Sequence, residues 1–288
     1  MRRQDIMFDH SPENPRIPAY LRFVTAIECC VVFMAASLLF FFPALAEKMW
    51  AWAIPPFNAR FVGAIYSAAY LPLLIFWYSS RWTPGRLVLL MIFVFTSLIM
   101  GVMIFHWDSF AWDRLSTFLI FWPLYFFLPI NSIIFLIRSR TIPLPSPVEM
   151  PSIWRIILTI FAISGFVYGI GLLFAPETLT RFWPWHVDAF HGRIYASAFI
   201  TPAAGAWVLG RKGGARSEYL TFGLNLLAGG ILPAIGTLMT NISSPPDHQI
   251  AFDDLGTWMF FMLFFLTGIL GAIQLALVFQ KSNKLENK

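Results

Sequence analysis

Long apolar runs separated by short polar segments dominate the chain. Seven runs contain no Asp, Glu, Lys or Arg, and they cover residues 61–80, 87–107, 115–137, 156–176, 194–210, 219–246 and 255–280. An eighth run, residues 23–46, is interrupted only by Glu28. A helix needs roughly 20 residues to cross ~30 Å of hydrocarbon. Strand-like alternation is absent and backbone groups in lipid must bond within their own segment, so each run predicts a membrane-spanning helix.

Composition agrees with a membrane protein. Of the 288 residues, 58% are hydrophobic and only 12% are charged, whereas soluble domains average roughly 25% charged residues. The polar tail at residues 1–19 lacks the apolar core and cleavage site of a signal peptide, so we expect the first helix to remain in the mature protein. Cys29 and Cys30 are adjacent inside that helix and predict no disulfide framework.

Basic residues predict the orientation in the membrane. Fifteen of the 20 Lys and Arg residues fall in the two tails and in the connections after the second, fourth and sixth predicted helices. Because Lys and Arg accumulate on the cytoplasmic side, both termini are expected in the cytoplasm. The basic residues are scattered singly, which disfavours a nucleic-acid partner. We expect the lipid bilayer as the partner, with a homo-oligomer or a membrane complex left open. A multi-pass plasma membrane protein is predicted, and the short loops favour a bacterial inner membrane.

The two halves of the chain resemble each other. With a shift of 133 residues, residues 18–60 align with 151–193 without a gap. The most informative matches are Pro18 with Pro151, Arg22 with Arg155, Pro43 with Pro176, Trp50 with Trp183, Trp52 with Trp185 and Arg60 with Arg193. With a shift of 140, residues 111–118 (AWDRLSTF) match 251–258 (AFDDLGTW). The extra residues fall in a polar loop, where an insertion costs little.

This pattern predicts an all-α membrane protein in which eight helices form two tandem four-helix repeats. The first repeat covers 20–137 and the second covers 153–280, with cytoplasmic segments at 1–19, 138–152 and 281–288. Four helices are an even number, so both repeats enter the membrane from the same side. They should therefore be parallel and related by a pseudo-two-fold axis along the membrane normal.

The repeated polar residues all fall on the predicted non-cytoplasmic side. We expect Arg60 to pair with Asp113, and Arg193 with Asp253, because charges at membrane depth are costly unless paired. The alternative is that each aspartate caps the start of a helix.

An aromatic and histidine set accompanies these charges and forms the candidate outer-face site. Its members are Trp50, Trp52, Trp183, Trp185, His186 and His191. The tryptophans are typical of the interfacial belt of a membrane protein, with stacking on a ligand as the alternative. His186 and His191 are five residues apart, a spacing that does not favour a metal site. The sequence nominates no cofactor and no metal centre.

Polar residues inside the predicted spans are few. Glu28 is the only intramembrane carboxylate, and Asn131 and Asn225 are the deep amides. An ionisable group inside a membrane is a functional candidate by default, here as a proton or cation site. A protonated Glu28 that forms a hydrogen bond with another helix is the commoner explanation.

Three classes of function follow from these features. The composition permits a scaffold or accessory subunit, and Glu28 with the Pro/Gly-containing helices favours a transporter of small, apolar or weakly polar solutes. A membrane enzyme with a polar site on the outer face is the alternative. No GxSxG, HExxH, P-loop or GxGxxG motif nominates a catalytic residue, so the enzyme ranks lowest.

Overall fold

The computed structural model describes residues 11–145 and 147–286, and within those ranges all of its secondary-structure elements are helices. The first ten residues and the last two of the predicted cytoplasmic tails lie outside the described residues. The long helices are α2 (Ala19–Phe41), α4 (Pro56–Ser79), α5 (Trp82–Phe105), α6 (Trp122–Arg138, preceded by a π-helical turn at Thr117–Phe121), α7 (Ser152–Phe174), α9 (Ala189–Lys212), α10 (Arg216–Ser243) and α11 (Leu255–Glu286). The short helices are α3 (Pro43–Met49) and α8 (Pro176–Leu179), with 3-10 turns at Trp107–Ser109 and Pro246–His248.

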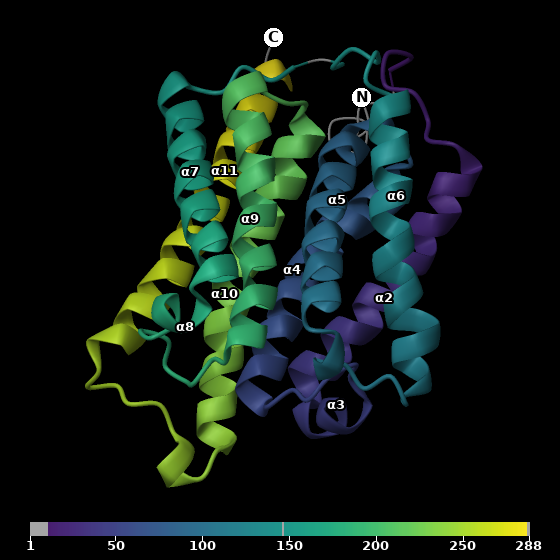
Figure 1. The fold of residues 1–288 in the computed structure, drawn as a ribbon. Helices are drawn as coiled ribbons and strands as arrows, with labels where there is room; N and C mark the ends of the chain where they lie inside the picture. The colour runs from purple at the N-terminus through teal and green to yellow at the C-terminus, as the bar shows by residue number, and fades with distance from the viewer. Residues whose placement is uncertain (1–10, 146, 287–288) are drawn as a thin grey trace.

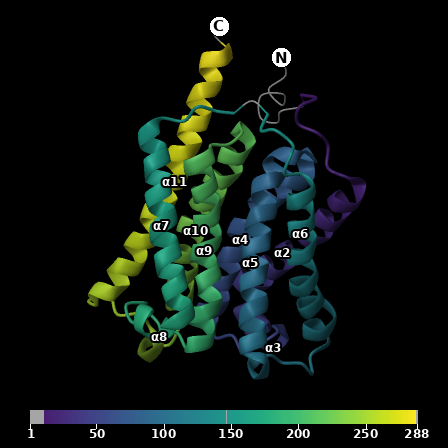
Figure 2. The same cartoon turned by 45° about the horizontal axis from the view of Figure 1, so that its top comes forward.

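The long helices form two layers of four. One layer has the order α7, α9, α5, α6, and the other has the order α11, α10, α4, α2, with extensive packing between successive helices in each layer (Figure 1). The second view shows the same two layers (Figure 2). Each layer therefore contains one helix pair from residues 20–137 and one pair from residues 153–280. Contacts between the layers are concentrated on the four central helices, α4, α5, α9 and α10.

The two ends of the bundle differ in what they carry. One end holds α3 and α8, and we call it the α3/α8 end (Figure 1). The other end holds the α6–α7 connection, the start of α2 and the end of α11, and we call it the linker end (Figure 1).

Local sequence explains several helix boundaries and close approaches. Pro56 lies in the first turn of α4, where the missing proline N–H costs nothing. The Asp188 side chain caps α9 by accepting from the His191 backbone N–H. A Cβ on Gly230 would lie 2.2 Å from the backbone nitrogen of Gly268, so α10 and α11 can approach this closely only because position 230 is glycine.

Seven of the described helices are long and apolar enough to cross a membrane. Six are the α-helices α2, α4, α5, α7, α10 and α11, and the seventh is the continuous helical segment from Thr117 to Arg138. The sequence predicted an eighth span over residues 194–210. The corresponding helix α9 has 24 residues but is less apolar than the others, because small and weakly polar residues such as Thr201, Ala203 and Gly205 take the place of Leu and Phe.

Candidate functional site

A cavity of about 1140 Å³ lies between the helix layers, and all eight long helices contribute side chains to its wall. It opens to the surface of the bundle, because exposed side chains such as Met34, Ile160 and Met262 belong to the wall. The wall is overwhelmingly apolar, with Leu, Ile, Val, Met and Phe predominating. Cavities that hold drug-sized ligands measure ~300–1,000 Å³. The space is therefore large enough for a whole organic molecule.

Among the described residues, Glu28 is the only charged one that lines this cavity. Its side chain is 5% exposed, and none of the described residues forms a hydrogen bond or an ion pair with it. Asn225 also lines the cavity, and its Nδ2 donates to the backbone oxygen of Ala68 at 3.0 Å. Asn131 is buried on α6 but is not part of the cavity wall. The structure thus brings two of the three predicted intramembrane residues to one space.

A tyrosine pair in the cavity wall was not foreseen from the sequence. The hydroxyl groups of Tyr66 on α4 and Tyr125 on α6 form a hydrogen bond with each other, and both side chains are buried. This contact joins the two layers across the cavity. A single tyrosine in an apolar helix looks like any other packing residue, so no sequence signal marks it.

At the α3/α8 end, Arg60 lies at a junction of three helices. Its Nε donates to the backbone oxygen of Phe40 at 3.2 Å, in the last turn of α2. Its Nη1 donates to the hydroxyl oxygens of Thr240 at 2.9 Å and Ser243 at 3.4 Å, near the end of α10. The last carbonyl groups of a helix lack intrahelical partners and carry partial negative charge, so a buried guanidinium is stabilised there.

Arg193 occupies a matching junction between α7, α9 and α5. Its Nε donates to the backbone oxygen of Leu173 at 3.0 Å, in the last turn of α7. Its Nη1 donates to His106 Nε2 at 3.0 Å, and its guanidinium lies 5.0 Å from the centre of the Phe105 ring. Because an arginine can only donate, His106 accepts this bond as the neutral imidazole.

The predicted ion pairs are wrong. Among the described residues, no salt bridge joins Arg60 to Asp113 or Arg193 to Asp253, and both aspartates are exposed. The sequence reasoning assumed that the second and fourth helices of a half are neighbours. Instead α4 packs against α10 and α9 packs against α5, which directs each arginine to the other half of the chain.

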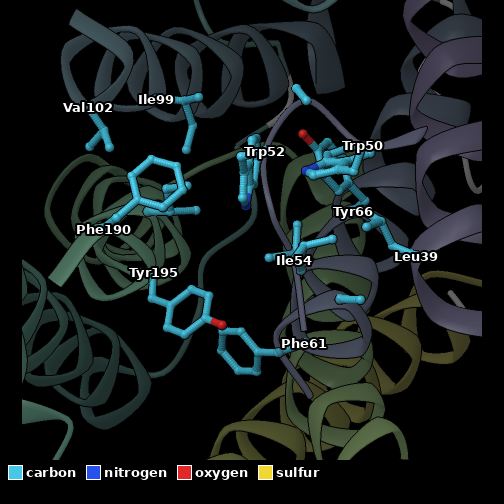
Figure 3. Close-up of a cluster of buried hydrophobic side chains, with 14 of the residues drawn as sticks. Leu39, Trp50, Trp52, Ile54, Phe61, Tyr66, Ile99, Val102, Phe190 and Tyr195 are labelled. Atoms are coloured by element: carbon cyan, nitrogen blue, oxygen red, sulfur yellow. The ribbon is translucent and has the colours of Figure 1, made fainter. Parts of the chain in front are cut away.

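The interpretation of the tryptophans as interfacial residues is also wrong. Trp50, Trp52 and Trp183 are 8%, 2% and 4% exposed and belong to a buried aromatic cluster, together with the partly buried Trp185. Figure 3 shows Trp50 and Trp52 in this cluster. The Trp50 and Trp52 rings meet edge to face at 5.3 Å, and the Trp183 and Trp185 rings do so at 5.2 Å. These rings fill the space between helices instead of facing the lipid headgroups.

Contacts between rings also join the two halves of the chain. Trp52 lies edge-on to Phe190 with a centroid distance of 5.6 Å, and Trp185 stacks on Phe57 at 5.4 Å. Figure 3 shows the first of these pairs and the neighbouring Tyr195 ring. Trp52 and Trp185 therefore each pack on an aromatic residue of the opposite half.

Asn58 connects two of these aromatic side chains by hydrogen bonds. Its Oδ1 accepts from Trp185 Nε1 at 2.7 Å and from Tyr195 Oη at 2.8 Å. Asn58 is 2% exposed, so both donors depend on this one oxygen. The sequence analysis assigned no role to Asn58, so this connection was missed.

The two candidate histidines lie in different environments. His186 is exposed, whereas His191 is 3% exposed and its Nδ1 lies 2.7 Å from Asp188 Oδ2. Partial burial of Asp188 alone would raise its pKa. The hydrogen bonds and charge interaction with His191, together with the Phe190 backbone N–H, outweigh burial and lower the pKa to about 2. The Nε2 atom of His191 is buried without a hydrogen-bond partner among the described residues.

The linker end carries a further contact between the halves that the sequence did not reveal. Arg86 on α5 binds the carboxylate of Glu218 on α10 through two hydrogen bonds, of 2.8 and 2.9 Å. The Glu218 side chain is fully buried and also accepts from the backbone N–H of Ala215. Both residues lie near helix starts, where charged residues are common, so nothing in the sequence distinguishes this pair.

Comparison with known proteins adds no family. No family model matches the chain, and no curated protein or solved structure matches it significantly. The structure by itself defines the class. Several apolar helices carry large exposed hydrophobic side chains, such as Phe105, Val167 and Phe174 at 72%, 68% and 82% exposure, which need lipid contact. The protein is an all-α, multi-pass membrane protein.

Proposed function

We propose that the protein is an eight-span transporter that carries a small, apolar or weakly polar solute in the cavity between its helix layers. The observation that supports this function is the cavity of about 1140 Å³ with its apolar wall. A scaffold or accessory subunit needs only a solid bundle, and filled space is what close packing normally gives. A volume of this size is therefore better explained by a bound solute than by a scaffold role.

The proposal includes α9 as the eighth span. It has the same length as α4, at 24 residues, and it packs along α7 and α5 in the centre of one layer. A helix shielded from lipid by neighbours on both sides can be less apolar than the outer helices. Small residues on α9, including Ala203 and Ala206 at 0% exposure, suit that central place.

We further propose that residues 20–137 and 153–280 are two parallel copies of one unit. The support is a set of matching contacts at a spacing of 133 residues. Arg60 with Phe40 corresponds to Arg193 with Leu173, and each bond joins residues 20 apart. In this scheme α2, α4, α5 and α6 correspond to α7, α9, α10 and α11. Replacing each helix of one layer by its counterpart gives the helix order of the other layer. This arrangement supports a pseudo-two-fold axis along the membrane normal. The distribution of Lys and Arg supports placing both termini in the cytoplasm, and the short loops favour a bacterial inner membrane.

The enzyme alternative rests on the polar groups at the α3/α8 end. Asp188 and His191 form a pair with a buried, unpartnered Nε2, an arrangement that general bases share. Neither residue lines the large cavity, however, so the polar pair and the solute-sized space do not coincide. The transporter is therefore the better-supported function.

Photolabelling of the purified full-length protein tests occupancy of the cavity. The probe is 3-trifluoromethyl-3-phenyldiazirine, and the label is mapped by mass spectrometry with and without excess trifluoromethylbenzene as competitor. We expect label on cavity residues of α2 and α4 to be saturable and to fall with competitor. Label on lipid-facing residues such as Val167 should increase with probe concentration without saturating.

A matched pair of variants locates the binding space. A Cβ on Gly229 would lie 3.7 Å from Ala68 Cβ with open cavity beyond, so Gly229→Phe should fill the cavity and abolish the saturable label. Gly101→Phe adds the same ring to an exposed position on α5 where a Cβ meets nothing within 4 Å, and it should change nothing. If cavity label in the wild type were unsaturable, the transporter proposal would fail.

A further inference from the structure

The cavity contains a carboxyl group that the protein leaves without a partner. Glu28 lies on α2, is 5% exposed, and forms no hydrogen bond or ion pair with any described residue. In the described part of the chain, no Lys, Arg, Asp or second Glu lines the cavity. The other ionisable groups in the wall are the hydroxyls of Tyr66, Tyr125 and Tyr168, which ordinarily ionise only near pH 10. On its own helix, Glu28 is followed by the thiols of Cys29 and Cys30.

An unpartnered carboxylate in an apolar space is strongly disfavoured. Burial of an ionised group without a counter-charge is costly enough that the group takes up a proton instead. A positive charge brought close in the same space reverses this preference, because the two charges attract strongly where water is scarce. The protein provides no such charge in the cavity, so a bound molecule has to provide it.

Aromatic rings from the same half of the chain as Glu28 also line the cavity, and such rings suit a positive charge. Phe95 lies 6.1 Å from Tyr66 and 6.4 Å from Tyr125, and Phe121 lies 4.5 Å from Tyr125, all as centroid distances. The four rings line the cavity from α4, α5 and the α6 segment. Ring faces attract organic cations and repel anions.

We propose that the cavity takes a lipophilic monocation, meaning an organic cation with an apolar body, and that Glu28 is its counter-ion. This inference rests on the proposed transport function and specifies its substrate class. In the empty cavity Glu28 is protonated. When the cation binds, the carboxyl O–H bond breaks, the proton leaves to water, and the carboxylate pairs with the cation. Release reverses the step, so one cation exchanges for one proton and the charge of the cavity stays constant.

Binding of tetraphenylphosphonium to the purified full-length protein tests the inference. Isothermal titration in buffers of different ionisation enthalpy measures both affinity and proton release. We expect wild-type protein to release about one proton per cation bound. Glu28→Gln should weaken binding at least about tenfold and abolish proton release, whereas Glu28→Asp should keep the release. Glu47→Gln changes an exposed glutamate at the α3/α8 end and should behave as wild type.

A neutral probe of similar shape, triphenylphosphine oxide, separates the two proposals. If wild-type protein binds the neutral probe but not the cation, the substrate class is wrong while the apolar binding site stands. If it binds neither probe, the transport function also fails. Cation binding without proton release in the wild type, or with equal affinity in a folded Glu28→Gln variant, would overturn the role of Glu28. Proton release is measured on the wild-type protein. The inference can therefore be refuted even if the Glu28→Gln variant does not fold.

Discussion

The Arg60 side chain donates a hydrogen bond from Nε to the backbone oxygen of Phe40, 3.2 Å away in the last turn of α2. Arg193 occupies the equivalent position on α9, and its Nε donates to the backbone oxygen of Leu173 in the last turn of α7. The outer nitrogens of both arginines then reach the end of a helix from the other half of the chain. These two junctions tie together the α3/α8 end of the bundle.

Replacing Arg60 by methionine should destabilise the protein by about 1–3 kcal/mol, because the Phe40 and Thr240 acceptors lose their buried donor. Arg193→Met should cost a similar amount if the two halves are copies. Thermal unfolding in detergent measures both effects. Arg181→Met removes an exposed arginine at the same end and is the matched control. Equal unfolding temperatures for all three variants would contradict the junction role.

Asn58 provides the second prediction at this end. Asn58→Leu should destabilise the protein by about 1–3 kcal/mol, because Trp185 Nε1 and Tyr195 Oη lose their common acceptor in a buried site. Tyr195→Phe removes one of the two donors. The double variant should therefore be less destabilised than the sum of the single variants. Additive effects in this thermal unfolding cycle would show that the hydrogen bonds are not coupled through Asn58.

The sequence predicted the helices well because membrane spans are defined by local composition. The apolar run at 115–137 agrees with the helical segment that ends at Arg138, and the run that begins at residue 156 agrees with α7, which begins at Ser152. The repeat alignment also drew attention to Arg60 and Arg193, which proved to be buried or partly buried donors at helix ends. Such features can be predicted from local sequence. The thickness of the hydrocarbon layer sets the length of a span, and the unpaired backbone groups at a helix end require polar partners nearby.

The partners of those residues could not be predicted, because they depend on which helices are neighbours. Adjacency of the second and fourth helices in a half would have placed Arg60 near Asp113, but α4 instead packs on α10 and brings Thr240 to it. Hydrophobic periodicity is weak in spans that face lipid on one side and apolar helices on the other. For the same reason the burial of Trp52, the Tyr66–Tyr125 contact and the cavity had no sequence signal.

His106 should make stability depend on pH. Burial first, and then the positive charge of Arg193, lower the His106 pKa below its usual 6.5, although Asp188 opposes them. The folded state then binds a proton less readily than the unfolded state, so stability rises with pH in this window. The contribution should be complete above about pH 6.5 and should decrease as the pH falls towards the folded pKa.

The measurement is the unfolding temperature between pH 8 and pH 5 for wild type and for His106→Gln. Glutamine keeps an acceptor for Arg193 but does not titrate, so the variant should lose the part of the pH dependence that His106 contributes. Asp188, with a pKa of about 2, stays ionised throughout this range. If the unfolding temperatures of the two proteins changed with pH in the same way, His106 would not contribute to the pH dependence, and its predicted titration beside Arg193 would be wrong.

The orientation of the two halves gives the last prediction. Lys48 and Arg181 are equivalent under the shift of 133 residues, and both are exposed at the α3/α8 end. Parallel copies place both positions outside the cell, whereas inverted copies would place them on opposite sides. We expect Lys48→Cys and Arg181→Cys, each in a protein with Cys29 and Cys30 replaced by alanine, to react with a membrane-impermeant maleimide in intact cells.

Thr141→Cys provides the opposite reference. Thr141 is exposed in the α6–α7 connection, so its cysteine should react only after the cells are permeabilised. Each substitution lies on an exposed surface, where changes rarely exceed about 0.5 kcal/mol, and labelling therefore reports position and not misfolding. Reaction of Lys48→Cys and Arg181→Cys from different sides would rule out parallel copies. Reaction of both only after permeabilisation would keep the copies parallel but place the α3/α8 end, and the two arginine junctions, in the cytoplasm.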